Sequence, residues 1–283
     1  MSYSKGYLII ANSEQEIKAA TACAYSILSH NKDALITLVN KDAGNRHGTK
    51  NAVFDNVVSI PFGQEADHRR LYDWQLYWAT SYTYNIVVDC YSLIKEDLSS
   101  TWDYLLDHYE LCFPTKVLNF KNETLFEQRY ESLEKRDLHT VYSDLFFFKK
   151  DSDIALNYFK LLDPYSKEWK IICDKFFERH EIPLSYDPNL IHSLCVGHLD
   201  IFKECTPLHD NILSYIDMAL AKQHIFDKDI DNYTNYMNVW PSTNGKIKIQ
   251  NFALSRSISY TLPEFLTEEI FNGQREYYKL TSR

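Results

Sequence analysis

Two aspartates stand at positions where a carboxylate could take part in chemistry. Asp89 follows the apolar run 85–88, so it ends a predicted buried strand. A carboxylate there is costly unless it meets a metal ion, a hydroxyl or a cation, although an aspartate also commonly starts a plain turn. Asp187 precedes Pro188, which suits the N-cap of a helix with proline at its first position. Each aspartate therefore has a structural and a chemical interpretation.

Five basic side chains could hold an anionic ligand such as a diphosphate. They are Arg69, Arg70, Lys246, Lys248 and Arg256, with solvated surface charge as the alternative for each. The chain has 7 glycines and no G-x-x-x-x-G-K-[ST], G-x-G-x-x-G or G-x-S-x-G motif. Kinase, dinucleotide oxidoreductase and serine hydrolase functions thus lose their main support, and any phosphate binding must rest on side-chain cations.

Buried strands alternate with helices in the first part of the chain. Short apolar runs predict strands buried on both faces at residues 6–12, 34–40 and 57–61. Ser13, with Glu16 three residues later, forms a capping-box pattern ahead of a predicted helix over residues 17–28. This order predicts an α/β fold with a mostly parallel sheet. The polar loop 41–51 follows a strand at the edge where such sheets bind ligands.

The rest of the chain has no repeat and no Ser/Pro-rich linker. Helical spacing of apolar residues predicts helices over residues 68–81, 102–109, 151–162, 169–179, 188–196 and 266–278. Apolar runs predict strands over residues 85–91, 116–120, 140–149, 246–252 and 257–260. A single α/β domain is the simplest organisation, with the last third packed over the edge that binds ligands.

Composition limits the partners and the compartment. With 30 Lys and Arg against 39 Asp and Glu, the formal charge is −9, so diffuse attraction to nucleic acid or an anionic membrane is not expected. The 6 cysteines have no C-x-x-C spacing and lie mostly in apolar segments, which indicates reduced core thiols and a cytoplasmic protein. No segment approaches 18 apolar residues, so we expect a soluble protein without a membrane span.

Separated segments of the chain resemble a known family. Residues 74–82 (WQLYWATSY) and 85–89 (NIVVD) resemble the W-Q-x-x-x-A-T-P-Y and T-I-x-L-D-x-D run of phage-encoded GT-A glycosyltransferases. Residues 141–150 (VYSDLFFFKK) are similar to their V-Y-x-A-F-F-Y-F-K-K strand. The tail segments KIKIQNF, ISY and FLTEEI resemble L-K-I-G-N-Y, F-H-Y and F-L-T-D-E-I-I, at residues 246–252, 258–260 and 265–270. The resemblance covers nearly the whole chain in order.

The resemblance implies a GT-A-like domain, a Rossmann-type sheet flanked by helices with a C-terminal extension of short strands and a helix. Residues 1–120 would be the nucleotide-binding half, and 121–283 the acceptor-side half and C-terminal closure. The implied activity moves a sugar from a nucleotide diphosphate donor, most simply a UDP-sugar, to an acceptor hydroxyl. The implied acceptor is 5-hydroxymethylcytosine, or its glycosylated form, in phage DNA within the host cytoplasm. A basic strip of Lys246, Lys248 and Arg256 would contact the DNA.

Two departures from the family pattern concern the metal. Members hold a divalent ion with both acids of Asp-x-Asp and the histidine of F-H-Y, whereas this chain has Asp89-Cys90-Tyr91 and Ser259. Tyrosine and serine hydroxyls are poor substitutes for a carboxylate and an imidazole around Mg²⁺ or Mn²⁺. Either donor binding is metal-independent, with Asp89 as the one family ligand left for a metal, or transferase activity has been lost. The alternatives are an inactive GT-A-like binding protein, or a transferase acting on a polysaccharide or a protein.

The expected site combines the residues introduced above. Asp187 and Asp144 are the candidate catalytic side chains, because the resemblance places a sugar-binding aspartate at the first, and the second replaces a small residue of the family. Ala11 and Asn12 end the first strand, where such a sheet receives a nucleoside. The residues expected to bind the donor are Ala11, Asn12, Arg70, Gln75, Asp89, Tyr91, Lys248, Asn251, Arg256 and Ser259.

Overall fold

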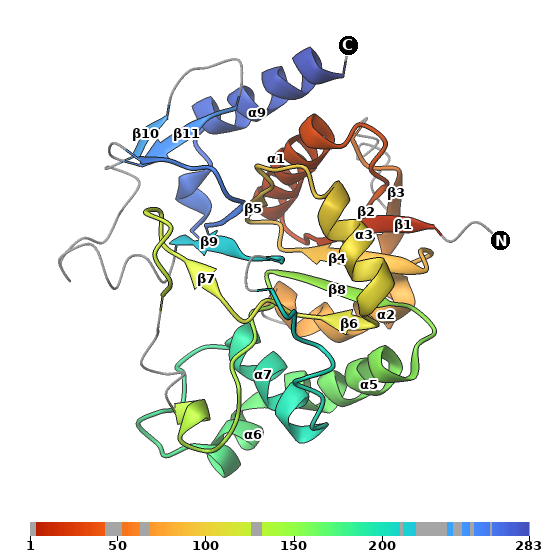
Figure 1. The fold of residues 1–283 in the computed structure, drawn as a ribbon, viewed down its shortest axis with the longest axis vertical. Helices are drawn as coiled ribbons and strands as arrows, with labels where there is room; N and C mark the ends of the chain where they lie inside the picture. Colours follow the sequence, from red (N-terminus) through yellow and green to blue (C-terminus); the bar gives the residue numbers. More distant parts are fainter. Residues whose placement is uncertain are drawn as a thin grey trace.

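A central sheet, drawn from red to green in Figure 1, organises the computed structural model. The structure describes residues 4–42, 53–62, 68–125, 132–209, 212–218, 237–239, 245–249, 252–260 and 262–282, and within these the sheet has six strands in the order β3-β2-β1-β4-β8-β6. The first four run parallel, while β8 is antiparallel to both β4 and β6. The strands span Asn56–Ser59 (β3), Ile36–Asn40 (β2), Lys5–Ile10 (β1), Tyr84–Val88 (β4), Leu145–Lys149 (β8) and Leu111–Cys112 (β6).

Burial on both faces explains why these apolar runs form the middle of the sheet. Leu8 and Ile9 of β1 expose no surface, and every residue of β2 is buried. Gly6 lies against the ring of Tyr82, where an added Cβ would come within 2.3 Å of a ring carbon. A larger residue at position 6 would therefore force the Tyr82 ring to move. The parallel pairing of β3, β2, β1 and β4 confirms the prediction of a mostly parallel α/β sheet.

Helix α1 (Glu14–His30) begins at the predicted capping box. The Ser13 hydroxyl accepts a hydrogen bond from the N–H of Glu16 at 3.2 Å, and the Glu16 carboxylate accepts one from the N–H of Ser13 at 2.9 Å. Helix α9 (Glu268–Thr281) packs against α1, as the top of Figure 1 shows. Helix α3 (Ser99–His108) follows a short strand, β5 (Ser92–Leu93).

The segment predicted as one helix over residues 68–81 is shorter and of two kinds. A 3-10 helix, η2 (Arg69–Gln75), leads into a single α-helical turn, α2 (Leu76–Ala79). Residues three apart are eclipsed in a 3-10 helix, and the Arg70 and Asp73 side chains form an ion pair at that spacing, with Nε and Oδ2 2.6 Å apart. The ion pair is a local reason for the tighter helix.

Three further helices lie together at the bottom of Figure 1. They are α5 (Asp153–Lys167), α6 (Trp169–Phe176) and α7 (Pro188–His198). Helix α5 packs against both η2 and α7. The helices predicted at these positions are confirmed, with ends shifted by a few residues.

Two smaller sheets complete the described fold. One has the order β5-β13-β9-β7, and the other is antiparallel with the order β10-β11-β12. The single strand predicted over residues 246–252 is wrong, because the chain reverses within that segment and Lys248 of β11 pairs with Ala253 of β12. The strands span Ser92–Leu93 (β5), Ile258–Ser259 (β13), Tyr215–Asp217 (β9), Val117–Leu118 (β7), Met237–Val239 (β10), Ile247–Ile249 (β11) and Phe252–Ala253 (β12), and a 3-10 helix η4 spans Pro263–Phe265.

The six cysteines are all buried and free, which confirms the prediction of core thiols outside disulfides. Within the described ranges, none of the helices combines the length and the apolar character needed to cross a bilayer.

Candidate functional site

The carboxyl end of β4 and the start of β8 bring two aspartates together. The two strands are antiparallel, and Val88 lies opposite Leu145. Asp89 and Asp144 extend this pairing by one residue, with the N–H of Asp89 donating to the carbonyl of Asp144 at 2.8 Å. Sheet topology therefore places both carboxylates at the edge where parallel sheets bind ligands.

A polar pocket of about 330 Å³ opens at this edge. Its walls come from η2, from the ends of β4, β9 and β13, from the residue before β8 and from the start of α7. The lining residues are His68, Arg69, Arg70, Asp89, Asp144, Pro183, Ser185, Tyr186, Asp187, Pro188, Asn189, Asp217 and Ser259. Four aspartates thus face two arginines, so the wall is rich in hydrogen-bond acceptors.

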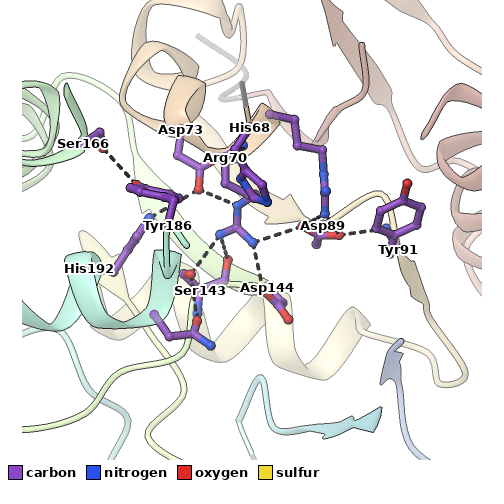
Figure 2. Close-up of polar contacts among 12 residues, drawn as sticks. His68, Arg70, Asp73, Asp89, Tyr91, Ser143, Asp144, Ser166, Tyr186 and His192 are labelled. Atoms are coloured by element: carbon purple, nitrogen blue, oxygen red, sulfur yellow. Dashed lines mark hydrogen bonds and ion pairs between the residues drawn. The ribbon is translucent and has the colours of Figure 1, made fainter. Parts of the chain in front are cut away.

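The guanidinium of Arg70 lies between the carboxylates of Asp73, Asp89 and Asp144 (Figure 2). Its Nη1 donates to both Asp89 Oδ2, at 3.0 Å, and Asp144 Oδ1, at 2.8 Å. Its Nε donates to Asp73 at 2.6 Å, and its Nη2 donates to the carbonyl and the hydroxyl of Ser143 at 2.9 and 2.8 Å. Arg70 is only 4% exposed. Its donor capacity of five N–H groups is therefore fully used within the protein.

Arg69 also contacts Asp89 and is less constrained than Arg70. Its Nη2 lies 2.6 and 2.5 Å from the two carboxylate oxygens of Asp89, and its guanidinium lies over the Tyr91 ring, 4.5 Å from the ring centroid. Its Nη1 is 3.8 Å from the Glu16 carboxylate, beyond hydrogen-bond distance, and its buried Nε has no hydrogen-bond partner among the described residues. Arg69 thus keeps donor capacity that Arg70 lacks.

The ion pairs fix the charge of these groups. Burial alone would raise the pKa of Asp89, but the guanidinium groups of Arg69 and Arg70, with the N–H of Tyr91, outweigh it and lower this pKa to about 2. Burial alone would lower the pKa of Arg70, but the neighbouring aspartates raise it well above its usual value. Burial and the same arginines lower the pKa of His68, so His68 is neutral at pH 7.

A buried chain of hydrogen bonds holds Arg70 from behind. Asp73 Oδ2 accepts from Arg70 Nε and lies 3.3 Å from Nε2 of His192, whose Nδ1 lies 2.6 Å from the Tyr158 hydroxyl. Burial lowers the pKa of His192, so the imidazole is neutral. Because a carboxylate can only accept, Nε2–H donates to Asp73, and Nδ1 accepts from Tyr158. The chain ties η2, α7 and α5 together behind the pocket.

The start of α7 forms another wall of the pocket. Asp187 caps the helix, with Oδ1 accepting from the N–H of Leu190 at 3.3 Å and Pro188 at the first helical position, as its sequence context predicts. Asn189 Oδ1 accepts from the N–H and the hydroxyl of Ser143 at 2.8 and 2.9 Å. Asp187, 5% exposed, is therefore held at a fixed position facing the pocket.

The C-terminal strand β13 supplies the last wall. The Ser259 hydroxyl donates to Asp144 Oδ2 at 2.6 Å. Ser259 also pairs with Asp217 across the parallel strands β13 and β9. Ser259 thus fixes the Asp144 carboxylate and lies beside a further acid of the pocket.

Five of the predicted site residues meet in this one pocket: Arg70, Asp89, Asp144, Asp187 and Ser259. Tyr91 lies next to them, with its ring against the Arg69 guanidinium. Ala11 and Asn12 directly follow β1, the strand adjacent to β4, and the N–H of Asn12 donates to Glu16 at 2.8 Å.

Three further predicted residues, Gln75, Lys248 and Arg256, are not among those that line the pocket. Gln75 is buried, and its side-chain oxygen accepts from the N–H of Phe62 at 3.0 Å. Lys248 lies in β11, and Arg256 Nη1 lies 3.7 Å from a carboxylate oxygen of Glu96. Asn251 and most of the loop 41–51 fall outside the described residues.

Sequence reasoning missed several residues of the site. Asp217 ends an apolar strand, as Asp89 follows one, so the same signal could have identified it. Asp73, Asn189 and His192 carry no comparable signal, because their roles come from tertiary contacts: Asp73 with Arg70, Asn189 with Ser143 and His192 with Asp73.

No protein-family model matches this chain, and no curated protein matches it in sequence. The galactosyltransferase LgtC, solved in complex with donor and acceptor sugar analogs, superposes with a TM-score of 0.53 at 11% identity, over 98% of this chain and 95% of LgtC. The glycosyltransferase GlyE of Streptococcus pneumoniae TIGR4 superposes with a TM-score of 0.53 at 10% identity, over 99% of this chain and 62% of GlyE. These similarities confirm the predicted GT-A-like fold.

The residues around Asp89 do not fit the divalent metal that the resemblance implies. The carboxylates of Asp89 and Asp144 are bonded to guanidinium groups, and Ser259 donates to Asp144. Across the described ranges, the His, Cys, Asp and Glu side chains form no group of three or more that could hold a metal ion. An arginine thus lies where carboxylate oxygens would otherwise be available to a cation.

Proposed function

We propose that this protein is a glycosyltransferase that moves a sugar from a nucleotide diphosphate donor, a UDP-sugar, to an acceptor hydroxyl. The observation that carries the proposal is the aspartate-rich pocket at the carboxyl end of β4. In open α/β sheets, ligands bind at that edge. Support comes from the shared fold, since a galactosyltransferase with this fold was crystallised with donor and acceptor sugar analogs.

Asp187 and Asp144 are assigned to sugar hydroxyls. Both carboxylates line the pocket, and ionised carboxylates accept hydrogen bonds from hydroxyl groups, with about twice the strength of neutral acceptors. Asp144 is fixed by Arg70 and Ser259, and Asp187 by its capping bond to Leu190. Two carboxylates held in place in this way would orient a sugar ring rather than merely attract it.

Arg69 is assigned to the diphosphate of the donor. Negative charge grows on the leaving diphosphate in the transition state, so a cation at that point accelerates transfer. Arg69 lines the pocket and keeps unused donors, whereas those of Arg70 are occupied. Contacts further along the donor are proposed for Ala11, Asn12, Gln75, Tyr91, Lys248, Asn251 and Arg256.

The acceptor proposed is 5-hydroxymethylcytosine, or its glycosylated form, in DNA. The support is the sequence resemblance to phage-encoded transferases, together with Lys246, Lys248 and Arg256 as a local basic strip in a chain of net charge −9. A base within a duplex would have to be flipped out, or its hydroxymethyl group reached in the major groove. A polysaccharide or protein hydroxyl is the alternative acceptor.

A second candidate function is a GT-A-like protein that binds a ligand without transferring sugar. The observation in its favour is the complete use of the Arg70 donors by buried protein groups. A site held this tightly could recognise a ligand and lack the cation needed for catalysis.

The test is UDP release from a panel of UDP-sugars, with hydroxymethylcytosine DNA, cytosine DNA or oligosaccharides as acceptors. We expect release to continue in EDTA. Labelled sugar should enter hydroxymethylcytosine DNA and not cytosine DNA; equal labelling of both DNAs would remove this acceptor. Release with oligosaccharides alone would favour the alternative acceptor. No release with any acceptor, together with no donor-induced rise in melting temperature, would contradict the transferase function.

Variants separate the proposed roles. Asp187→Asn keeps a good helix cap but removes the charge, so transfer should fall roughly 10- to 100-fold, the value of a charge-assisted hydrogen bond. Arg69→Ala should weaken donor binding more than acceptor binding. Asp174→Asn, which changes an exposed aspartate on α6, is the control and should leave transfer unchanged. Equal activity of Asp187→Asn and the control would remove Asp187 from the site.

A further inference from the structure

We propose that Arg70 occupies the place of a divalent cation between Asp89 and Asp144, so that its removal converts this protein into a metal-binding one. A single atom, Nη1, bridges the two carboxylates at 3.0 and 2.8 Å. A bridging ion between two carboxylates would have to occupy this same region. The chain thus supplies from its own side chain the positive charge that would otherwise come from solution.

The charges also match those of a divalent ion. Asp89 Oδ2 lies 2.5 Å from Arg69 Nη2 and 3.0 Å from Arg70 Nη1, so two guanidinium groups converge on one carboxylate. Together they carry two positive charges, as Mg²⁺ and Mn²⁺ do. A metal ion entering the same space would meet both like charges at close range and find its oxygen ligands already bonded.

The arginine is held more firmly than a surface ion pair would be. Asp73 fixes Nε at 2.6 Å, and Ser143 fixes Nη2 through two bonds. Asp73 is itself 1% exposed and bonded to His192, so the acceptor of Nε is held in place in its turn. A cation built in this way cannot be removed by a chelator.

Asp73 lies behind Arg70 and does not line the pocket, which allows a charge-balanced design. Arg70→Ala removes the group that bridges the two carboxylates, which frees Asp144 Oδ1 and leaves Asp89 with Arg69 as its guanidinium partner. It also leaves Asp73 buried without its guanidinium, so this variant can lose stability. In the double variant Arg70→Ala with Asp73→Asn, the change removes one positive and one negative charge. The amide oxygen introduced by Asp73→Asn can still accept a hydrogen bond from His192, and the two carboxylates at the pocket remain.

The experiment measures Mn²⁺ binding, with the metal alone, by calorimetry and by the loss of the free-Mn²⁺ electron paramagnetic resonance signal. We expect weak or undetectable binding by the wild-type protein. The double variant, and Arg70→Ala where it folds, should bind one ion about 100-fold or more tightly than wild type, because the like charge between the carboxylates is gone, Asp144 Oδ1 is free and Asp89 retains one guanidinium partner instead of two. A further Asp89→Asn change should abolish this binding.

Two controls isolate the charge at this position. Arg70→Lys keeps a positive charge between the carboxylates and should not gain Mn²⁺ binding. Arg136→Ala removes an arginine bonded to Glu181 at 2.7 Å, away from the pocket, and should not gain it either. Stoichiometric Mn²⁺ binding by the wild type that is lost on Asp89→Asn, or a folded double variant that binds no more Mn²⁺ than wild type, would overturn the inference.

The inference rests on the proposed function in one respect, namely that the positive charge of Arg70 would serve sugar transfer. Mn²⁺ binding is measured without donor, acceptor or turnover. A variant that gains the metal while no form of the protein releases UDP would retain the inference and refute the transferase. UDP release that stops in EDTA would refute the inference and retain the transferase.

Discussion

Asp89→Asn is the perturbation that tests the electrostatic account of the pocket most directly. The asparagine has nearly the same shape, but it cannot carry the charge that Arg69 and Arg70 contact at 2.5 to 3.0 Å. The pKa of Asp89 falls from 3.8 to about 2 on folding. Since one pKa unit is about 1.4 kcal/mol, the ionised carboxylate contributes roughly 2 kcal/mol of stability at neutral pH.

The sign of the pH dependence follows from the lowered pKa. Below pH 3.8 the unfolded chain binds a proton at Asp89 that the folded protein does not yet bind, so stability falls as the pH falls. The contribution is complete above about pH 4 and is lost as the pH approaches 2. The variant lacks this contribution at every pH, so the difference between the two proteins should shrink on acidification.

The assay is urea unfolding of both proteins at pH 7, 5, 4 and 3. We expect Asp89→Asn to lower the free energy of unfolding by roughly 2 kcal/mol at pH 7, which is a fall of roughly 4 to 8 °C in melting temperature for a chain of about this size. Glu276→Gln, which removes an exposed pair with Lys279, is the control and should not move the midpoint. A difference that is absent at pH 7, or constant down to pH 3, would refute the ion-pair account.

Three further predictions concern the scaffold around the pocket. Gly6→Ala should destabilise the protein by about 1 to 3 kcal/mol, because its Cβ would overlap the Tyr82 ring. The Cβ of Gly273→Ala in α9 meets no described atom within 4 Å, so this variant should stabilise the protein by about 0.5 to 1 kcal/mol. Urea unfolding measures both changes, and equal effects would contradict the packing around β1. Burial lowers the pKa of His192 from 6.5, so the unfolded chain takes up the proton first and stability should fall as the pH drops below about 6.5. His192→Gln should therefore show a smaller decline in the urea midpoint between pH 7 and pH 5.5 than the wild type. An unchanged decline would exclude His192 as its source. Burial raises the pKa of all six thiols, those of Cys23, Cys90, Cys112, Cys173, Cys195 and Cys205. A thiol reagent should therefore modify none of them in the folded protein and all six in urea. Rapid labelling of the folded protein would contradict their assignment to the core.

Local patterns in the sequence were enough for the framework of the fold. Continuous apolar runs predicted β1, β2 and β4 because strands buried on both faces need apolar residues on both. The Ser13 and Glu16 pair predicted the start of α1, and the Asp187-Pro188 pair predicted the start of α7, because caps depend on neighbours within one helical turn. The order of these elements predicted a mostly parallel α/β sheet, and the resemblance implied the GT-A-like fold.

The sequence by itself also predicted five site residues that the structure places in one pocket, from their types, their places beside predicted elements and the resemblance: Asp89, Asp144, Asp187, Ser259 and Arg70. It could not determine what these side chains do to one another. That depends on the antiparallel pairing of β4 with β8, which sets Asp89 beside Asp144, and on the packing of η2 against α5, which directs Arg70 between them. Electrostatic energy depends on distances between groups far apart in the chain, so only the tertiary structure decided that an arginine bridges these two carboxylates.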